Sequence, residues 1–131
     1  MAVADGNGLP LACGIASGER HEARLVHDTL KTSFLDELPT RLIGDKAYDS
    51  DPLDEQLAAT GIDMISPNRR TNVCRTQDGR KLRRYRRRWL IERLFAWLFR
   101  SRRLVTRYEH KAENFLGFVQ LACIVVLVRR F

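Results

Sequence analysis

Residues 82–104, LRRYRRRWLIERLFAWLFRSRRL, contain no glycine or proline and predict one long helix. Successive residues of a helix are rotated by about 100°, so side chains three and four positions apart share one side. The apolar side consists of Leu90, Ile91, Leu94, Trp97 and Leu98. The opposite side consists of Tyr85, Arg88, Glu92, Phe99 and Arg103. We expect the first side to pack on a core and the second to face a partner.

Glu92 is the only acid in this stretch, and it follows Arg88 by four residues. On a helix surface these two side chains can form an ion pair that contributes roughly 0.3–0.5 kcal/mol. That structural interpretation is sufficient when the pair is considered by itself. A functional interpretation of Glu92 needs support from elsewhere in the chain.

The positive charge of the chain is concentrated around this helix. The whole chain has a formal net charge of +7, whereas Arg69 to Lys111 contain 16 Lys and Arg against the three acids Asp78, Glu92 and Glu109. The rest of the chain is therefore net negative. A dense basic surface is the electrostatic signature of a polyanion-binding protein, and a charged face kept for solubility usually mixes both signs. The pattern predicts a nucleic-acid partner.

Several site classes find no support in the sequence. Its cysteines, Cys13, Cys74 and Cys123, are far apart and odd in number, so they predict neither a disulfide framework nor a zinc site. No two of the three histidines stand at a metal-ligand spacing on a helix. The first residues lack the basic segment and long apolar run of a signal peptide. These features predict a protein of a reducing cytoplasm.

The part of the chain before the basic region alternates between strand and helix patterns. Asp5-Gly6-Asn7-Gly8 is a strong turn signal that predicts a hairpin with a very short first strand. The strand patterns occupy residues 1–4, 9–17, 42–44 and 63–66, and helix patterns occupy residues 19–35 and 52–60. A polar segment at 68–81 predicts a loop before the long helix.

An apolar helix is predicted at 112–128, after the long helix. Its apolar centre is short for a bilayer and contains Gln120, so we expect a core helix and no membrane span. The alternation along the chain predicts an α/β fold in which one short mixed sheet is flanked by helices. The length of 131 residues fits a single domain over 1–131.

Two carboxylates occupy positions that suit chemistry. Asp45 directly follows a buried strand, at the end where α/β sheets place their ligands, and Glu92 lies on the exposed side of a later helix. Carboxylate oxygens are ligands for Mg²⁺, and two such ions can stabilise the attacking and leaving oxygens of a phosphoryl transfer. Spacing alone is weak support, because most domains contain an Asp and a Glu this far apart.

Two motifs in this order give the pair more weight. The string GDKAYDS at 44–50, followed by YRRRWLIERLFAWLFRSRRLVTRYE at 85–109, resembles the catalytic domain of bacterial insertion-sequence transposases of the DDE type. Within that group it resembles the branch with the signature Tyr-x-x-Arg-x-x-x-Glu, met here by Tyr85, Arg88 and Glu92. The segment ADGNGLPL and the closing apolar helix also look like this family, so the resemblance covers nearly the whole chain.

The resemblance implies an RNase H-like fold in which three acids bind Mg²⁺ for DNA cleavage and strand transfer. By position, Asp45 corresponds to the second acid and Glu92 to the third, and both are expected to bind metal. Tyr85 and Arg88 are expected to contact the DNA backbone or hold Glu92. The candidate DNA-binding residues are Tyr85, Arg86, Arg87, Arg88, Arg100 and Arg103. The resemblance also implies element-end and target DNA as partners, self-association, and a bacterial cytoplasm.

The sequence departs from the family pattern in two places. The signature continues with a Lys seven positions after the Glu, where this chain has Phe99, so that role is expected to pass to Arg100 or, on the Glu92 side, to Arg103. In addition, the strand and Asp that normally precede the hairpin have no counterpart, and Asp5 belongs to the turn. The expected fold is therefore incomplete, with its first strand missing and its domain truncated at the N-terminus.

Three functional hypotheses remain. The chain is part of a transposase catalytic domain that needs an upstream segment supplying the first acid, either as a remnant or as half of a frameshifted fusion. Alternatively, it is a catalytically inactive remnant that binds DNA. The third hypothesis is an unrelated basic nucleic-acid-binding module whose carboxylates are purely structural.

Overall fold

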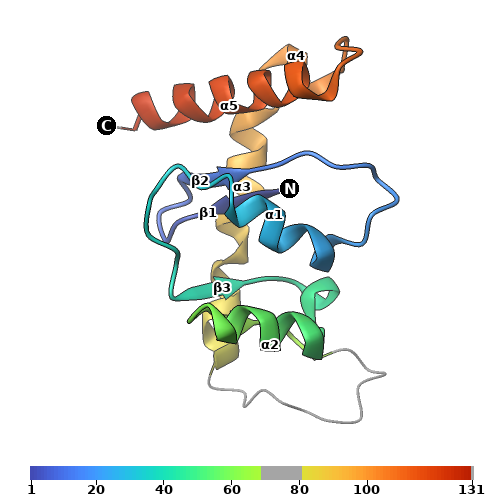
Figure 1. The fold of residues 1–131 in the computed structure, drawn as a ribbon. Helices are drawn as coiled ribbons and strands as arrows, with labels where there is room; N and C mark the ends of the chain where they lie inside the picture. The colour runs from blue at the N-terminus through green and yellow to red at the C-terminus, as the bar shows by residue number, and fades with distance from the viewer. Residues whose placement is uncertain (69–80, 131) are drawn as a thin grey trace.

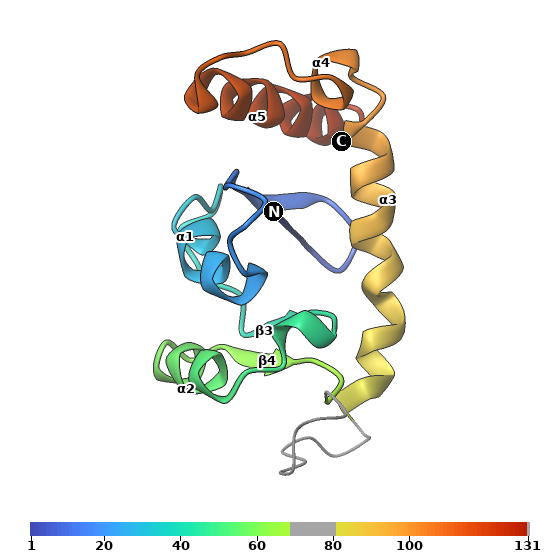
Figure 2. The ribbon, with the colours of Figure 1, turned by 90° about the vertical axis from the view of Figure 1, so that its right-hand side faces the viewer.

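A computed structural model describes residues 1–68 and 81–130. The described part is a mixed α/β structure with small sheets, as the sequence predicts. Its elements form three layers along one long helical rod (Figures 1 and 2). Helices α4 and α5 form the first layer, the N-terminal hairpin with α1 forms the second, and β3, β4 and α2 form the third. The predicted loop at 68–81 falls almost entirely outside the described residues.

The N-terminal hairpin forms where the turn signal predicts it. Strands β1 (Ala2–Ala4) and β2 (Pro10–Cys13) pair antiparallel. The Asp5 carboxylate closes the turn, because its Oδ1 atom accepts hydrogen bonds from the backbone N–H groups of Asn7 at 2.8 Å and Leu9 at 2.7 Å. Gly8 has a φ of +82°, a conformation that residues with a side chain rarely adopt.

Strands β3 (Arg41–Ile43) and β4 (Asp63–Ile65) pair parallel. Between them the chain forms the 3-10 helix η2 (Lys46–Tyr48) and the helix α2 (Asp51–Ala59), which give a crossover as parallel pairing requires. The prediction of one mixed sheet is wrong, since the described strands form two separate two-stranded sheets. Each strand has only three or four residues, and beyond its own hairpin β2 gains a single bridge, between Ala12 and Ser33.

The helix predicted at 19–35 is much shorter than its periodicity indicates. The structure has the 3-10 helix η1 (Glu22–Leu25) followed by α1 (Val26–Leu30). Contacts with the hairpin end it, because the Thr32 hydroxyl donates to the Cys13 carbonyl at 2.8 Å and the Phe34 N–H donates to the Leu11 carbonyl at 2.7 Å. Tertiary hydrogen bonds therefore replace further helical ones.

The prediction of one α-helix over 82–104 is also wrong in part. The chain forms the 3-10 helix η3 (Lys81–Arg88), then α3 (Trp89–Leu98), and after a break α4 (Arg102–Val105). Crowded arginines repel one another at α-helical spacing, which opposes a regular α-helix in the basic run. The break turns the chain so that Leu104, 8% exposed, returns to the same core as Leu98.

The apolar side predicted for this region is confirmed. Leu90, Leu94 and Leu98 are buried, and Ile91 and Trp97 are partly buried against the core. The final helix, α5 (Ala112–Val128), begins and ends where the sequence predicts. No helix within the described ranges is long and apolar enough to cross a membrane.

The apolar side chains form two core clusters on opposite sides of the hairpin. The first joins α3, α4 and α5 to β2 and contains Cys13, Leu94, Leu98, Leu104, Ala122, Cys123 and Val126. The second joins α1, α2 and β4 and contains Val26, Leu30, Leu53, Leu57, Ile62 and Met64.

Met1 and the residues of strand β1 contribute side chains to the two clusters in alternation. Ala2 and Ala4 pack on the first cluster, whereas Met1 and Val3 pack on the second. Successive side chains of a strand point to opposite faces. The hairpin is therefore the shared wall of the two cores.

Two buried thiols join the hairpin to α5 within the first cluster. Cys13 and Cys123 are both free and 0% exposed. Interaction between the two thiols lowers the pKa of Cys13 and, together with burial, raises that of Cys123. The described cysteines fit the prediction that the sequence has no disulfide framework; Cys74 lies outside the described residues.

Asp54 in α2 is a site of electrostatic strain. Burial first, and then the charges of Asp49, Asp51 and Asp63, raise the pKa of its carboxyl from 3.8 to about 6. An acid with a higher pKa in the folded chain than in the unfolded chain destabilises the fold when it is ionised. This contribution is fully unfavourable above about pH 6 and is relieved as the pH falls from about 6 towards 3.8.

We predict that Asp54→Asn raises the free energy of unfolding at pH 7 by up to about 1 kcal/mol, a small value because solvent screens a partly exposed group. The gain should shrink at pH 5, which urea denaturation at the two pH values measures. Asp51→Asn is the matched control, since Asp51 is an exposed acid in the same first turn of α2. A loss of stability at pH 7 for Asp54→Asn but not for Asp51→Asn would contradict the assignment.

Candidate functional site

Three side chains of η3 and α3 form one connected group. Arg88 Nε lies 3.3 Å from Glu92 Oε1, and both side chains are at least half exposed. Arg88 Nη1 donates to the Tyr85 hydroxyl at 2.6 Å, and its guanidinium lies 5.4 Å from the centre of the Tyr85 ring. Arg88 therefore links the tyrosine to the carboxylate.

Neighbouring groups raise the pKa of Arg88 above its ordinary value. The hydrogen bond with Tyr85 is the largest cause that raises the pKa of Arg88, followed by the charges of Tyr85, Glu92 and Asp45. The Asp45 carboxylate thus acts on the same guanidinium as Glu92. The fold allows this, because η3 contacts both β3 and β4 at the end of the molecule where Asp45 follows β3.

Asp45 follows β3 as the sequence predicts, but the prediction of a buried strand is wrong, because Arg41 and Ile43 are exposed and Leu42 is only partly buried. The Asp45 Oδ1 atom accepts from the Ala47 N–H at 2.7 Å, so the carboxylate caps η2. Gly44 precedes it because a Cβ there would lie 2.6 Å from both Met64 Cε and Tyr48 Cδ2. Burial, followed by the charges of Glu22 and Asp45, raises the pKa of Tyr48 to about 12.

The side chains of Asp45 and Glu92 carry carboxylate oxygens, the type of ligand that hard divalent cations prefer. Both are exposed carboxylates; Glu92 pairs with Arg88, and the charge of Asp45 contributes to the raised pKa of Arg88. Within residues 1–68 and 81–130, no three acidic, histidine or cysteine side chains come together as a group that could hold a metal. A metal-binding role for Asp45 and Glu92 therefore stays a prediction.

The family model of the transposase DDE domain matches residues 1–127 of the sequence. The chain belongs to this family.

Two relatives agree with this result. This transposase-family chain is 29% identical over 137 residues to the putative transposase for insertion sequence element IS402 of Burkholderia cepacia, covering 95% of the chain and 59% of that protein. It is 37% identical over 92 residues to the putative transposase for insertion sequence element IS6501 of Brucella ovis, covering 67% of each. The chain thus spans about three fifths of the first relative. The search of solved structures gives no match.

The other candidate DNA-binding residues of this transposase domain divide into two groups. Arg86 and Arg87 are exposed on η3 next to Arg88. Arg100 is exposed in the break between α3 and α4. Arg103 is separated from Glu92 by that break, and its Nη1 atom lies 2.9 Å from Glu109 Oε1. The expectation that Arg103 shares the side of Glu92 assumed an unbroken helix, which the structure does not have.

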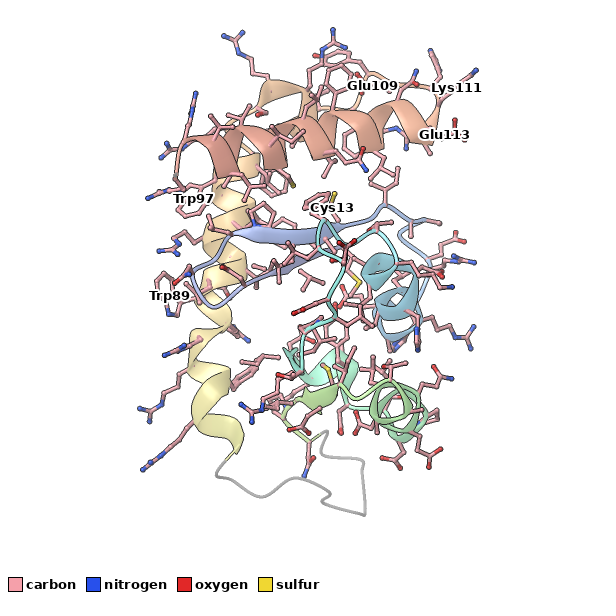
Figure 3. The ribbon with its side chains drawn as sticks, turned by 60° about the vertical axis from the view of Figure 1, so that its left-hand side comes forward. Cys13, Trp89, Trp97, Glu109, Lys111 and Glu113 are labelled. Atoms are coloured by element: carbon pink, nitrogen blue, oxygen red, sulfur yellow. The ribbon has the colours of Figure 1, made fainter. Side chains whose placement is uncertain are left out.

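Sequence reasoning did not find the role of Arg93. Its guanidinium lies 4.7 Å from the ring centres of both Trp89 and Trp97, which lie one above the other on the same side of α3 (Figure 3). Its Nη2 atom also donates to the Asn7 carbonyl in the hairpin turn. The spacing Trp-x₃-Arg-x₃-Trp was the signal, since residues four apart meet on a helix.

This Arg93 clamp, formed by Trp89, Arg93 and Trp97, explains why Gly8 occupies the turn. A Cβ at Gly8 would lie 2.7 Å from Arg93 Nη2, in addition to the cost of its positive φ. Gly61 has a similar φ of +78°, but nothing lies within 4 Å of a Cβ there. Both glycines have a positive φ, but only Gly8 lies close to Arg93. A comparison of the two positions therefore separates the cost of the backbone conformation from the cost of the close contact.

We predict that Gly8→Ala destabilises the fold by about 2–4 kcal/mol and Gly61→Ala by about 1–2 kcal/mol, because only the first displaces the stacked guanidinium. Urea denaturation measures both values, and tryptophan fluorescence should change only for Gly8→Ala. Equal losses for the two variants would show that the clamp does not constrain the turn.

Proposed function

We propose that this chain is the part of an insertion-sequence transposase that binds DNA and contributes two carboxylates to a phosphoryl-transfer site. The observation that carries the proposal is the group Tyr85–Arg88–Glu92, with the Asp45 charge acting on the same arginine. Family membership supports the reaction class and excludes the hypothesis of an unrelated basic module. The names of both relatives associate them with insertion sequences.

In this proposal Arg88 positions the acid and contacts the substrate. Its ion pair with Glu92 holds the carboxylate, and its hydrogen bond with Tyr85 orients the guanidinium. Arginine presents several donors in one plane, which suits a phosphate oxygen, and Tyr85 can donate to another. Arg86 and Arg87 extend the positive surface along the DNA backbone.

Asp45 and Glu92 are the proposed ligands for Mg²⁺, which would activate the attacking oxygen and stabilise the leaving oxygen in strand cleavage. The resemblance implies a third acid, carried by a strand that completes an RNase H-like sheet. Separate two-stranded sheets support this part of the proposal, since β1 and β3 each pair on one side only within the described residues. Cleavage of element-end DNA is therefore proposed for the chain together with that strand.

DNA binding by the chain is expected to depend steeply on salt, because contacts with phosphates release counterions. Replacing Arg86, Arg87 and Arg88 together by Ala should weaken binding to unrelated duplexes and reduce the salt slope by up to about three. Fluorescence anisotropy at several NaCl concentrations measures both effects. The control replaces Arg20, Arg24 and Arg41, which are also exposed, and removes the same charge. Equal losses for the two triple variants would place the contact surface elsewhere.

Cleavage tests the carboxylates. We predict no cleavage of element-end DNA by the 131-residue chain in Mg²⁺ or Mn²⁺, and cleavage by a fusion that adds an upstream strand ending in Asp. Asp45→Ala or Glu92→Ala should abolish the activity of the fusion, whereas Glu55→Ala, an exposed acid of α2, should retain it. Metal-dependent cleavage by the short chain that is lost in Glu92→Ala would refute the need for a third acid. Binding without cleavage by every fusion would favour the inactive, DNA-binding remnant.

A further inference from the structure

A groove between α4 and α5 combines an apolar floor with a basic rim. Its volume is about 540 Å³, within the range of about 300–1,000 Å³ typical of binding pockets. Its lining includes Phe118, Leu121 and Val125, which we call the apolar floor, and Arg100, Arg102 and Arg103, which we call the basic rim. We call this feature the α4–α5 groove.

The apolar floor continues into an exposed stripe on α5. Leu121, Ile124, Val125 and Val128 are 58%, 52%, 47% and 70% exposed. Their spacing of three and four residues places them on one side of the helix. Apolar stripes of this kind on helices normally contact another surface, and contiguous exposed apolar patches mark interaction sites.

The rim charges indicate the chemistry of the partner. Arg103 is already paired with Glu109. No ion pair among residues 1–68 and 81–130 involves Arg100 or Arg102, and both side chains are exposed. The groove therefore fits an occupant that brings apolar side chains together with acids.

The chain itself carries a segment with that composition. Phe34, Leu35 and Leu38 are 41%, 56% and 47% exposed, and the exposed acids Asp36 and Glu37 stand between them. This acidic segment, residues 34–38, follows α1 and runs along the side of the molecule towards β3 (Figure 1). It does not line the α4–α5 groove of its own chain.

We propose that the α4–α5 groove binds residues 34–38 of a second copy of this chain. Leu35 and Leu38 lie over the apolar floor, and Asp36 and Glu37 pair with Arg100 and Arg102. The contact is head-to-tail, because the two patches are different surfaces, so it builds a closed ring or a growing assembly. Complementary charge sets the direction and register of the contact.

The proposal goes beyond DNA binding and is tested without DNA. Sedimentation velocity of the full chain at increasing concentration should show an average mass that rises above that of the monomer, and less so at high salt. Leu121→Gln should weaken association at least about tenfold, because it places a polar amide on the apolar floor. Val105→Gln is the matched control, since Val105 is an exposed apolar residue of α4 that belongs neither to the groove nor to the α5 stripe. A wild-type chain that stays monomeric would overturn the proposal.

Charge reversal identifies the occupant. Arg100→Glu with Arg102→Glu should abolish association, and so should Asp36→Lys with Glu37→Lys, because each variant meets like charges in its own copies. Mixing the two variants should restore association, since the acidic groove of one fits the basic segment of the other. Non-specific aggregation does not depend on mixing. Loss of association in the groove variant alone, or a mixture that remains monomeric, would show that residues 34–38 are not the occupant.

Discussion

The stacking of Arg93 between Trp89 and Trp97 sets the relation between the hairpin and the long helical rod. A cation over an aromatic ring contributes about 0.5–2 kcal/mol, depending on how far it is desolvated. Here the same guanidinium meets two rings and also donates to the Asn7 carbonyl. Its Nε atom is buried and finds no partner within the described residues, which offsets part of the gain. The clamp therefore matters more for the position of α3 against the hairpin than for the stability of the fold.

The clamp has a direct consequence for the candidate site. Glu92 and Arg93 are neighbours on α3, so fixing the Arg93 side against the hairpin turns the Glu92 side outwards. The contacts of η3 with β3 and β4 then bring Arg88 within the influence of Asp45. The acid Asp45 and the base Arg88, 43 positions apart in the chain, act on one another because these tertiary contacts hold the rod in place.

The sequence predicted those features that depend only on residues close together in the chain. The Asp5–Gly8 turn, the apolar side of α3 and the bounds of α5 follow from turn chemistry and helical period, and all three are confirmed. The end of α1, the break before α4 and the separation of the two sheets depend on contacts between distant segments, which periodicity does not contain. Family membership is confirmed, whereas the roles of Asp45 and Glu92 stay predictions.

The two-sided hairpin limits how the N-terminal region can vary. Its alanines face one core and the larger Met1 and Val3 face the other. Deleting or inserting one residue in this strand would exchange the two sets, leaving voids on one side and overfilling the other. A change of two residues would preserve the sides. Length variation in this strand among relatives should therefore occur in even steps.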